Sequence, residues 1–488
     1  MSDFSMLLPL LVLCGGAIAV LLFGTSAGSG ARPLPAGIAL VSALAAFGVF
    51  LLHSPTSPQT GMGGFVTWDA LSCGAGALIA FATAVTAVVM GDGLKKVDAN
   101  HGEAYALLLF AAAGMTVMVT SAHLVAIFLG LEVMSLSLYV LCSLVRTRST
   151  STEAGLKYFL AGSFASGIFL MGLALLFGAA GRLDLAGVGQ ALALKTGPAV
   201  AGATLVLIGF AFKLALAPFH QWTPDVYEGA PTPVTGFMAT AVKVAGFATL
   251  LRSVEAYGSQ PFLHSAMVWL AALTMIVGNL GALAQTSVKR MLAYSSIGHA
   301  GYLMLAPIAV APGSSQAAEG MVTYLAAYVV TNLLAFAVLS YLETREGGGL
   351  TFAELRGVRW RHPLPTAALV IAVLSLAGAP PTAGFLGKFR VFGAAIDRGV
   401  ATGDRTYFYL VGLAILTSLI SLGYYLKVIV VTSFGEPEGE APALPRFSPA
   451  FKVTLLVLGS SVVWFGVGPT LFGVGAEGLM AFAKKAAG

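Results

Sequence analysis

The sequence predicts an all-α polytopic membrane protein that crosses the bilayer about fourteen times and forms a single membrane domain over residues 1–488. The first reason is composition: 57% of the residues are hydrophobic and only 10% are charged, whereas roughly 25% of a soluble protein is charged. Apolar runs of membrane-spanning length also recur with few residues between them. Several lysines nevertheless lie inside those runs, where a charge is costly and usually functional.

The spans follow from length and apolarity, because an α-helix needs roughly 20 residues to cross the hydrocarbon core. The boundary near 121–122 is the least distinct, since hydropathy does not separate a tight hairpin from a bend. The first run lacks the basic segment of a secretory signal and is interpreted as a retained helix. The predicted spans are 6–23, 35–53, 69–90, 104–120, 122–145, 156–180, 197–218, 232–253, 262–286, 291–310, 319–342, 364–398, 405–434 and 449–473.

Orientation follows from the lysines and arginines of alternate loops, because cytoplasmic loops are enriched in them. The two sets number twelve and seven, so the larger set is assigned to the cytoplasm and both termini to the periplasmic side of a bacterial inner membrane. The larger set is Arg32, Lys95, Lys96, Arg146, Arg148, Lys289, Arg290, Arg345, Arg356, Arg359, Arg361 and Arg446. The smaller set is Arg182, Lys195, Arg252, Arg398, Arg405, Lys484 and Lys485.

Several function classes are disfavoured by the same composition. The polar stretches 343–363 and 435–448 are too short to form a domain, so no soluble catalytic module is expected. The net charge of +5 does not indicate nucleic-acid binding, because the basic residues are spread over short loops. Cys14, Cys73 and Cys142 are far apart and predict no disulfide framework, zinc site or iron–sulfur cluster. No cofactor or metal is therefore expected in this chain.

The stretch 211–247 carries the strongest functional signal. An apolar run bearing Lys213 meets Pro218 and a polar segment, and a second apolar run follows with Lys243 near its middle. Irregular backbone at membrane depth survives only where protein or a water-filled cavity satisfies its polar groups. The pattern favours part of a proton or ion path. The alternative is that Lys213 extends to a helix end and the prolines only mark a loop.

A second interrupted span suggests an internal duplication. The run 364–398 breaks at 378–382, and Lys388 follows that break as Lys213 precedes the first one. Transporters built from inverted repeats carry broken helices at corresponding places in both halves. Two inverted five-helix repeats are predicted, over 104–253 and 262–434. Coincidence is the alternative, since proline-broken spans are common in membrane proteins.

Four charged residues inside the spans are the principal site candidates. Glu132 lies near the middle of its run, and Lys213, Lys243 and Lys388 lie in three others. A carboxylate and lysines from separate helices can pair in the bundle, which offsets part of the cost of insertion. Burial lowers the pKa of a lysine in general, which allows it to exchange a proton near neutral pH. These four residues are predicted to form a proton relay.

Four secondary relay candidates each have a structural alternative. Lys157 follows Glu153 by four residues, so an ion pair on the helix surface explains it equally well. His220 and His299 could pass protons because histidine titrates near neutrality, or could be ordinary buried histidines. Lys427 is close enough to a helix end to extend into water, or it could be an exit residue.

With these residues in place, the chain resembles the antiporter-like membrane subunits of respiratory complex I, the proton-translocating NADH–quinone oxidoreductase. The resemblance covers nearly the whole chain. Within that family it is most similar to the N-type subunits, because of its length, the absence of a long C-terminal lateral helix and the lysine at 388. The motifs are LGLEVMSLSLYVL (129–141), FKLALAPFHQWTPDVYEGAPTPVTGFMA (212–239), VKRMLAYSSIGHAGY (288–302) and SLAGAPPTAGFLGKF (375–389).

The resemblance implies roles for the matched residues. Glu132 would pair with Lys213, Lys243 would relay the proton, and Lys388 would hand it outward. Helices four to eight and nine to thirteen would be the inverted repeats. Lys157, His220 and His299 would lie on or beside the polar axis.

The resemblance also implies partners. The chain would work among the other membrane and peripheral subunits of the complex and the lipid bilayer, with NADH, FMN, iron–sulfur clusters and quinone bound elsewhere in the complex. No residue of this chain is placed to transfer a hydride or bind a nucleotide. The alternatives are a subunit of a cation/proton (Na⁺/H⁺) antiporter, and a membrane-bound hydrogenase subunit, including a scaffold that moves no ions. The sequence leaves the choice between H⁺ and Na⁺ open.

Overall fold

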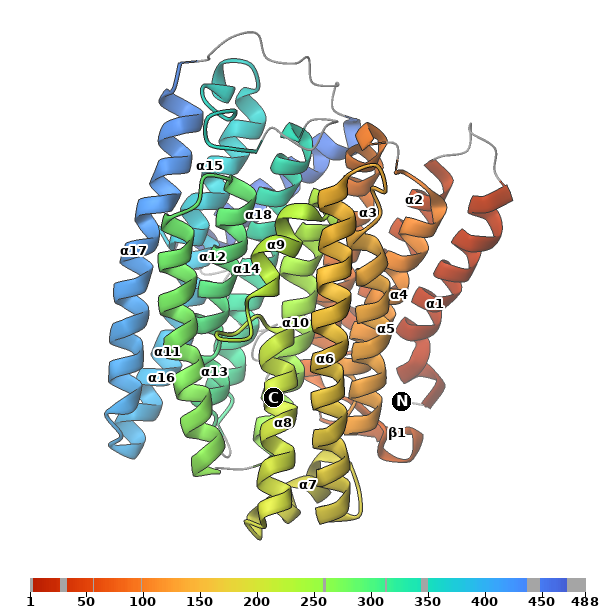
Figure 1. Cartoon of the computed structure of the whole chain (residues 1–488), viewed down its shortest axis with the longest axis vertical. Helices are drawn as coiled ribbons and strands as arrows, with labels where there is room; N and C mark the ends of the chain where they lie inside the picture. The colour runs from red at the N-terminus through yellow and green to blue at the C-terminus, as the bar shows by residue number, and fades with distance from the viewer. Residues whose placement is uncertain are drawn as a thin grey trace.

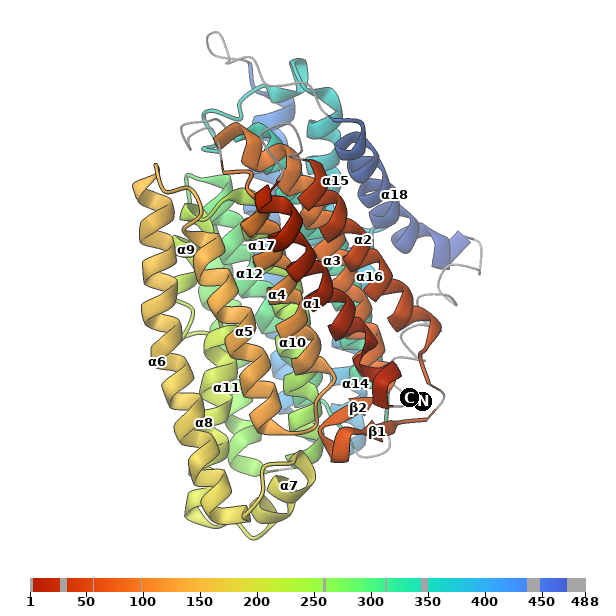
Figure 2. The same ribbon diagram turned by 90° about the vertical axis from the view of Figure 1, so that its right-hand side faces the viewer.

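The computed structural model is a bundle of α-helices that run in roughly one common direction (Figure 1). A view turned by 90° shows α6 along one edge and α18 along the other, with α10 between them (Figure 2). The structure describes residues 3–26, 33–55, 57–97, 99–257, 260–311, 314–343, 350–436 and 448–471.

The elements within those ranges are as follows. The first are α1 (Asp3–Ser26), α2 (Pro33–Leu52), α3 (Ala70–Gly93), α4 (Gly102–Val119), α5 (Leu124–Cys142), α6 (Ser149–Ala180), α7 (Leu185–Ala193), α8 (Gly197–Lys213) and α9 (Trp222–Gly229). The chain continues with α10 (Thr232–Tyr257), α11 (Pro261–Leu283), α12 (Val288–Leu303), α13 (Leu305–Ile308), α14 (Gln316–Leu342), α15 (Pro363–Ala377), α16 (Ala383–Thr402), α17 (Thr406–Phe434) and α18 (Pro449–Leu471). An antiparallel hairpin of β1 (Gln59–Gly61) and β2 (Val66–Trp68) precedes α3.

Eleven helices of the described ranges are long and apolar enough to cross a membrane, which confirms the prediction of a multi-pass membrane protein. The predicted runs 197–218, 291–310 and 364–398 are not among them, because each is divided. Helices α8, α12 and α15 end after 17, 16 and 15 residues. Helices of this length fall short of the roughly 20 residues that a span requires.

The two breaks in the predicted spans lie where the sequence places them. Helix α8 ends at Lys213 and α9 begins at Trp222. Helix α15 ends at Ala377, and Gly378 then takes the left-handed conformation with a φ of 85°. A Cβ atom at Gly378 would also approach the Lys388 side chain to 3.0 Å. Glycine is therefore required there both by the backbone and by the neighbouring lysine.

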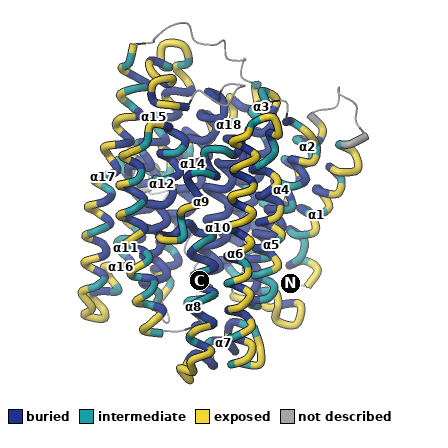
Figure 3. The backbone as a smooth tube through the Cα atoms, in the orientation of Figure 1, coloured by how far each residue is buried: buried dark blue, intermediate teal, exposed yellow. Residues whose placement is uncertain are grey.

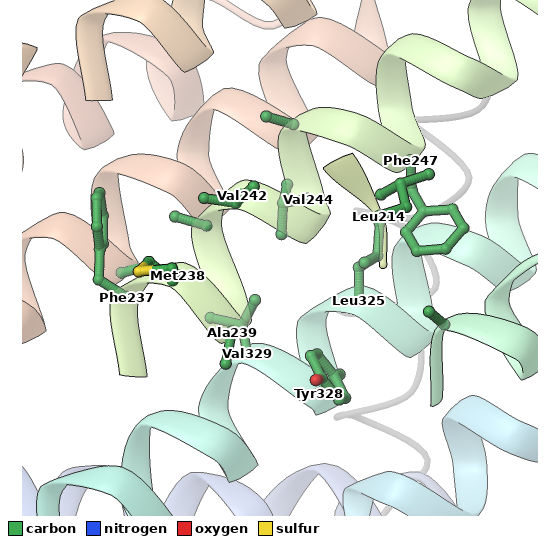
Figure 4. Packing of buried hydrophobic residues seen from close by; sticks show 14 of the residues in the cluster. Leu214, Phe237, Met238, Ala239, Val242, Val244, Phe247, Leu325, Tyr328 and Val329 are labelled. Carbon is green, nitrogen blue, oxygen red and sulfur yellow. The ribbon is translucent and has the colours of Figure 1, made fainter. Parts of the chain in front are cut away.

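Helices α10 and α14 form the centre of the bundle. Every residue in the most apolar 18-residue window of each is buried, whereas α1, α6 and α17 bury only about a third of theirs. The burial pattern in Figure 3 follows this division, with buried backbone inside and exposed residues on the outer helices. Phe237 and Val242 of α10 and Val329 of α14 belong to one apolar cluster, which also includes Leu214 from the break after α8 (Figure 4). Lys243, which is only 2% exposed, lies on one of these two central helices.

The two sets of basic residues lie at opposite ends of the bundle wherever the structure describes them. At one end, Arg148 pairs with Glu343 at 3.0 Å, and Lys96 donates to the carbonyl of Ser340 at 3.1 Å. At the other end, Arg252 pairs with Asp69. The loops of each set share an end of the bundle in Figure 1. Outside the described residues lie Arg32, Arg345, Arg446, Lys484 and Lys485, together with 344–349 and 437–447 of the two polar stretches and both ends of the chain.

Asp69 connects the start of α3 to the end of α10. Its carboxylate accepts the backbone N–H of Ser72 at 2.8 Å as the N-cap of α3. The Arg252 guanidinium donates to both carboxylate oxygens, at 2.6 and 2.9 Å. Burial by itself raises the pKa of the Asp69 carboxyl, but the charge and hydrogen bonds of Arg252 and the bonds from Ser72 outweigh burial and hold it below its usual value.

Asp69→Asn is expected to destabilise the protein, because it leaves the Arg252 guanidinium buried without its counter-charge. Breaking a buried pair in this way costs about 3–5 kcal/mol. The lowered pKa means that the stabilisation is present above the unfolded value of about 3.9 and is lost as pH falls through the folded one. The thermal midpoint in detergent should therefore fall at pH 7, and the difference from wild type should shrink below about pH 4. Asp404→Asn, at an exposed carboxylate, is the control.

Candidate functional site

The break after α8 exposes backbone groups deep in the bundle. Ala215 takes a left-handed φ of 58°, which turns the chain away from the helix axis. The carbonyl of Leu214 no longer serves a helix and instead accepts a hydrogen bond from Lys243 Nζ at 3.2 Å. The last carbonyls of a helix carry partial negative charge, so a lysine ammonium is stabilised there. The break thus creates a cation site without any carboxylate.

Lys213 is held by hydroxyl groups and aromatic rings. Its side chain is 4% exposed, and Nζ donates to Ser135 Oγ at 2.8 Å and to Tyr158 OH at 3.1 Å. The ammonium also lies 5.1 Å from the ring centroid of Tyr158 and 6.0 Å from that of Tyr139, within cation–π range. Tyr158 stacks on Trp222, the first residue of α9, at 4.5 Å. Lys213, which ends α8, and Trp222, which begins α9, therefore both contact Tyr158.

Glu132 and Lys213 do not form the direct ion pair that the sequence predicted. Both are described, and no carboxylate oxygen of Glu132 lies within 4.0 Å of Lys213 Nζ. Glu132 instead accepts a hydrogen bond from Ser166 Oγ of α6. It is only partly buried because it lies beside the outward row of α5, between Leu129 and Leu136, which are 57% and 54% exposed. Ser135, one helical turn from Glu132, takes its place as the partner of Lys213.

A small cavity lies between the two serines that hold these charges. Its volume is about 10 Å³, close to the 10–15 Å³ that one water molecule needs. Ser166, which binds Glu132, and Ser135, which binds Lys213, both line it. The wall is otherwise mostly apolar. The remaining lining residues are Leu131, Tyr139, Gly162, Ala165, Phe169, Gly209, Phe212 and Lys213 itself.

Lys388 occupies the corresponding position at the second break. It is 6% exposed, and its Nζ donates to the carbonyl of Ala377 at 2.9 Å and to Ser418 Oγ at 2.8 Å. Ala377 is the last residue of α15, so this ammonium too lies at the negative end of a helix. The ring of Tyr302 lies 5.3 Å from Nζ. At each break a backbone carbonyl therefore accepts a hydrogen bond from a lysine: Leu214 from Lys243 and Ala377 from Lys388.

His299 lies between Lys243 and Lys388 and is close enough to both to interact electrostatically. It is 3% exposed, with Nδ1 at 2.7 Å from Tyr324 OH and Nε2 at 3.1 Å from Tyr425 OH. One ring nitrogen of a neutral histidine donates and the other accepts, and each tyrosine hydroxyl can do either, so both tautomers of His299 fit these contacts. The surrounding hydroxyl and amide groups continue the network: Tyr425 with Ser295, Tyr328 with Ser296, and Asn279 with Tyr302 and Tyr424.

The structure places the other predicted relay residues apart from this axis. Lys157 is exposed on α6 and pairs with Glu153 and with Asp225, both at 2.7 Å. Lys427 is exposed, with its Nζ 4.1 Å from the centroid of the Phe352 ring. His220 lies half-buried in the segment between α8 and α9, and its Nδ1 is buried without a hydrogen-bond partner. The ion pair of Lys157 with Glu153 is the structural alternative that the sequence offered for this residue.

The sequence reasoning missed the neutral groups that hold the charges. Ser135 has a local signal, since it follows Glu132 by three residues and so lies on the same side of α5. Ser166 and Ser418 have none, because only the packing of α6 and α17 brings them to Glu132 and Lys388. The tyrosines around His299 come from α12, α14 and α17 and are likewise assembled by packing alone.

The chain is similar in sequence to a known family. Residues 121–415 match the transmembrane family of the NADH:quinone oxidoreductase and Mrp antiporter proteins. The NADH-quinone oxidoreductase subunit N 2 of Roseiflexus castenholzii is 41% identical over 445 residues, which cover 89% of this chain and 87% of the relative. The chain belongs to the NADH:quinone oxidoreductase/Mrp antiporter transmembrane family.

Two solved structures share the whole fold of this chain. A chain of respiratory complex I from Thermus thermophilus, solved with bound aureothin, superposes with a TM-score of 0.81 at 36% identity, covering 98% of this chain and 100% of that one. A chain of the Mrp complex from a Dietzia species superposes with a TM-score of 0.80 at 20% identity, covering 99% and 97%, so that likeness is one of fold alone. The resemblance to the antiporter-like, N-type subunits of complex I is confirmed.

Proposed function

We propose that this chain is the N-type, proton-translocating membrane subunit of an NADH–quinone oxidoreductase, and that it moves H⁺ along Glu132, Lys213, Lys243, His299 and Lys388. One observation carries the relay. Lys213, Lys243 and Lys388 are buried in the membrane domain, and within the described residues none of them has a carboxylate oxygen within 4.0 Å. A permanent buried charge without a counter-charge is costly, whereas a lysine that can release its proton avoids that cost.

The partners of the three lysines suit proton exchange. Each ammonium is held by neutral oxygens, from Ser135, Leu214 or Ala377, which can accept its hydrogen bond but cannot neutralise its charge. An ammonium that loses a proton to a neighbouring water or to the His299 imidazole becomes an amine and keeps its place. The proton then passes along hydroxyl, imidazole and water groups, all of which can both donate and accept.

The driving energy is of the size that one charged residue can supply. A tenfold change in a proton-binding constant corresponds to about 1.4 kcal/mol, so a thousandfold change supplies roughly 4 kcal/mol. Moving one charge against about 200 mV costs roughly 4–5 kcal/mol. In this proposal, movement of the Glu132 carboxylate toward or away from Lys213 changes the proton affinity of that lysine. The small cavity between Ser135 and Ser166 supplies space for a water molecule.

The number of membrane crossings, the internal repeats and the orientation of the chain are part of this proposal. About fourteen crossings arise when each broken helix is counted with the segment that follows it. The two halves, 104–253 and 262–434, act as inverted repeats, each with its own break and lysine. The end that carries Lys96 and Arg148 faces the cytoplasm, and both termini lie on the periplasmic side of a bacterial inner membrane. The other subunits of the complex hold NADH, FMN, iron–sulfur clusters and quinone.

A cation/proton antiporter subunit is the competing function, because the Mrp chain has the same fold. Identity of 36–41% to complex I proteins, against 20% to the Mrp chain, favours the oxidoreductase. The experiment that follows decides whether the coupled ion is H⁺ or Na⁺.

Affinity purification through a tag on this chain should separate the two functions. We expect the chain to co-purify with FMN, iron–sulfur clusters and NADH-dependent quinone reduction. In proteoliposomes made with sodium-free potassium buffer, NADH should still drive acidification of the lumen, measured with a pH-sensitive dye and abolished by an uncoupler. Purification with small antiporter subunits and no flavin, or pumping that requires Na⁺, would support the antiporter instead.

A further inference from the structure

A large cavity lies apart from the lysine axis, between the first and second halves of the chain. Its volume is about 680 Å³, within the range of pockets that bind small organic ligands. Most of its wall is apolar and comes from Val206 and Phe210 of α8, Leu250 of α10, Met267 of α11 and Ile308 of α13. The rest is polar and includes Ser253, Gln260 and Ser314. An apolar wall gives water few hydrogen-bonding partners, so that part of the cavity favours a hydrocarbon occupant.

Helices α8 and α11 both line the cavity, and the two helices contact each other. The outward side of α11 is strongly apolar, with Trp269 75% exposed and Phe262 59% exposed. A surface of this kind on a membrane-spanning helix faces lipid or another membrane subunit. One wall of the cavity is therefore a helix that borders the membrane.

The rim carries both signs of charge and one buried hydrogen-bond donor without a partner. The Nε of Arg398 is buried and has no hydrogen-bond partner, and the hydroxyl of Tyr257, a residue only 7% exposed, lies close to Ser253. Glu255 adds a carboxylate to the same rim, and His264, bonded to Tyr407 OH at 3.2 Å, lies beside Arg398. A buried donor normally has a partner, so the Arg398 guanidinium indicates a missing ligand group.

We propose that this cavity binds one phospholipid with a zwitterionic, amine-bearing headgroup. One acyl chain lies among Val206, Leu250 and Met267. The phosphate accepts hydrogen bonds from Arg398 and Tyr257, and the ammonium faces the Glu255 carboxylate. An acyl chain gains little by exchanging bilayer for an apolar cavity, so the headgroup contacts decide which lipid binds. The proposal does not depend on proton translocation by the chain.

Photo-crosslinking of the intact complex in nanodiscs tests the site. The nanodiscs contain phosphatidylethanolamine and phosphatidylglycerol, with a trace of phosphatidylethanolamine that carries a diazirine on one acyl chain. After illumination, we expect peptides from α8 and α11 that contain Ala203 and Met267 to carry the label. Ala203→Phe, which fills the cavity, and Arg398→Gln, which removes the phosphate donor, should each reduce that labelling several-fold. Arg405→Gln, at an exposed arginine of the same end, is the matched control.

Several outcomes would overturn the proposal. Labelling confined to outward residues such as Trp269, and unchanged by Ala203→Phe, would show that no lipid enters the cavity. Equal labelling by a phosphatidylglycerol probe, which has no ammonium group, would show that Glu255 does not select the lipid. Met267→Cys adds a measurement that does not depend on the other variants: rapid reaction with a water-soluble maleimide would mean that the cavity is filled with water. Protection of that cysteine from the maleimide is the expected result.

Discussion

Lys213→Ala is expected to abolish both NADH-driven proton pumping and quinone reduction in membranes that carry the assembled complex. The substitution removes the only titratable group at the end of α8 and leaves Ser135 and Tyr158 without their donor. Because general acid–base groups are worth about 10²–10⁴ in rate, we expect each activity to fall at least tenfold. Pumping is followed with a pH-sensitive dye and quinone reduction by the oxidation of NADH.

Two further variants make the Lys213 result specific. Lys213→Arg keeps the charge but is not expected to restore pumping, because a guanidinium does not release its proton in a protein. Lys95→Ala, at an exposed lysine, should leave both activities intact. Wild-type pumping and turnover in Lys213→Ala would contradict the relay and make this lysine structural. Co-purification of the other subunits with each variant shows whether the complex has assembled.

Lys388→Met is expected to cause a comparable loss, because it removes the proton carrier at the second break. Methionine has a similar length and suits an apolar site, so the variant should fold, although Ser418 and the carbonyl of Ala377 lose a donor. NADH-driven acidification of proteoliposomes measures the effect. The loss of these two hydrogen bonds, at about 0.5–1.5 kcal/mol each, costs only about 1–3 kcal/mol of stability, so the complex should still assemble.

Comparison with Lys427→Met distinguishes the two routes by which a proton could leave the chain. Lys427 is exposed and lies over the Phe352 ring, apart from the buried axis, so this variant should keep most of the wild-type pumping. Retained pumping in Lys388→Met together with its loss in Lys427→Met would place the exit at Lys427. Retained pumping in both variants would show that neither Lys388 nor Lys427 carries the proton, and would contradict the relay beyond Lys243.

The class of protein and the position of both breaks could be read from the sequence because their causes are local. Burial in a bilayer demands long apolar runs, and the chain shows them without reference to any fold. Proline disfavours a continuing helix, so the segments at 217–218 and 378–382 predict a break in each span, and α8 and α15 end shortly before them, at Lys213 and Ala377. The burial of Lys243 and Lys388 follows from their depth in those runs, and the structure confirms it.

The partners of each charge could not be read from the sequence, because they depend on how the helices rotate and pack. The rotation of α5 about its axis places Glu132 next to Ser166 of α6 and Ser135 next to Lys213. The opposite charges of Glu132 and Lys213 had suggested a direct contact between those two residues. Packing of α12, α14 and α17 surrounds His299 with tyrosines that lie up to 126 residues away along the chain.

The sequence by itself determined that this chain is a multi-pass membrane protein with lysines buried beside two broken helices, because the cost of transferring residues into lipid is a property of each run. Tertiary structure alone decided which neutral oxygen holds each lysine, where the small cavity between Ser135 and Ser166 lies, and that the two halves enclose a large, mostly apolar cavity. Those features depend on distances between side chains from different helices, and no local pattern of residues specifies them.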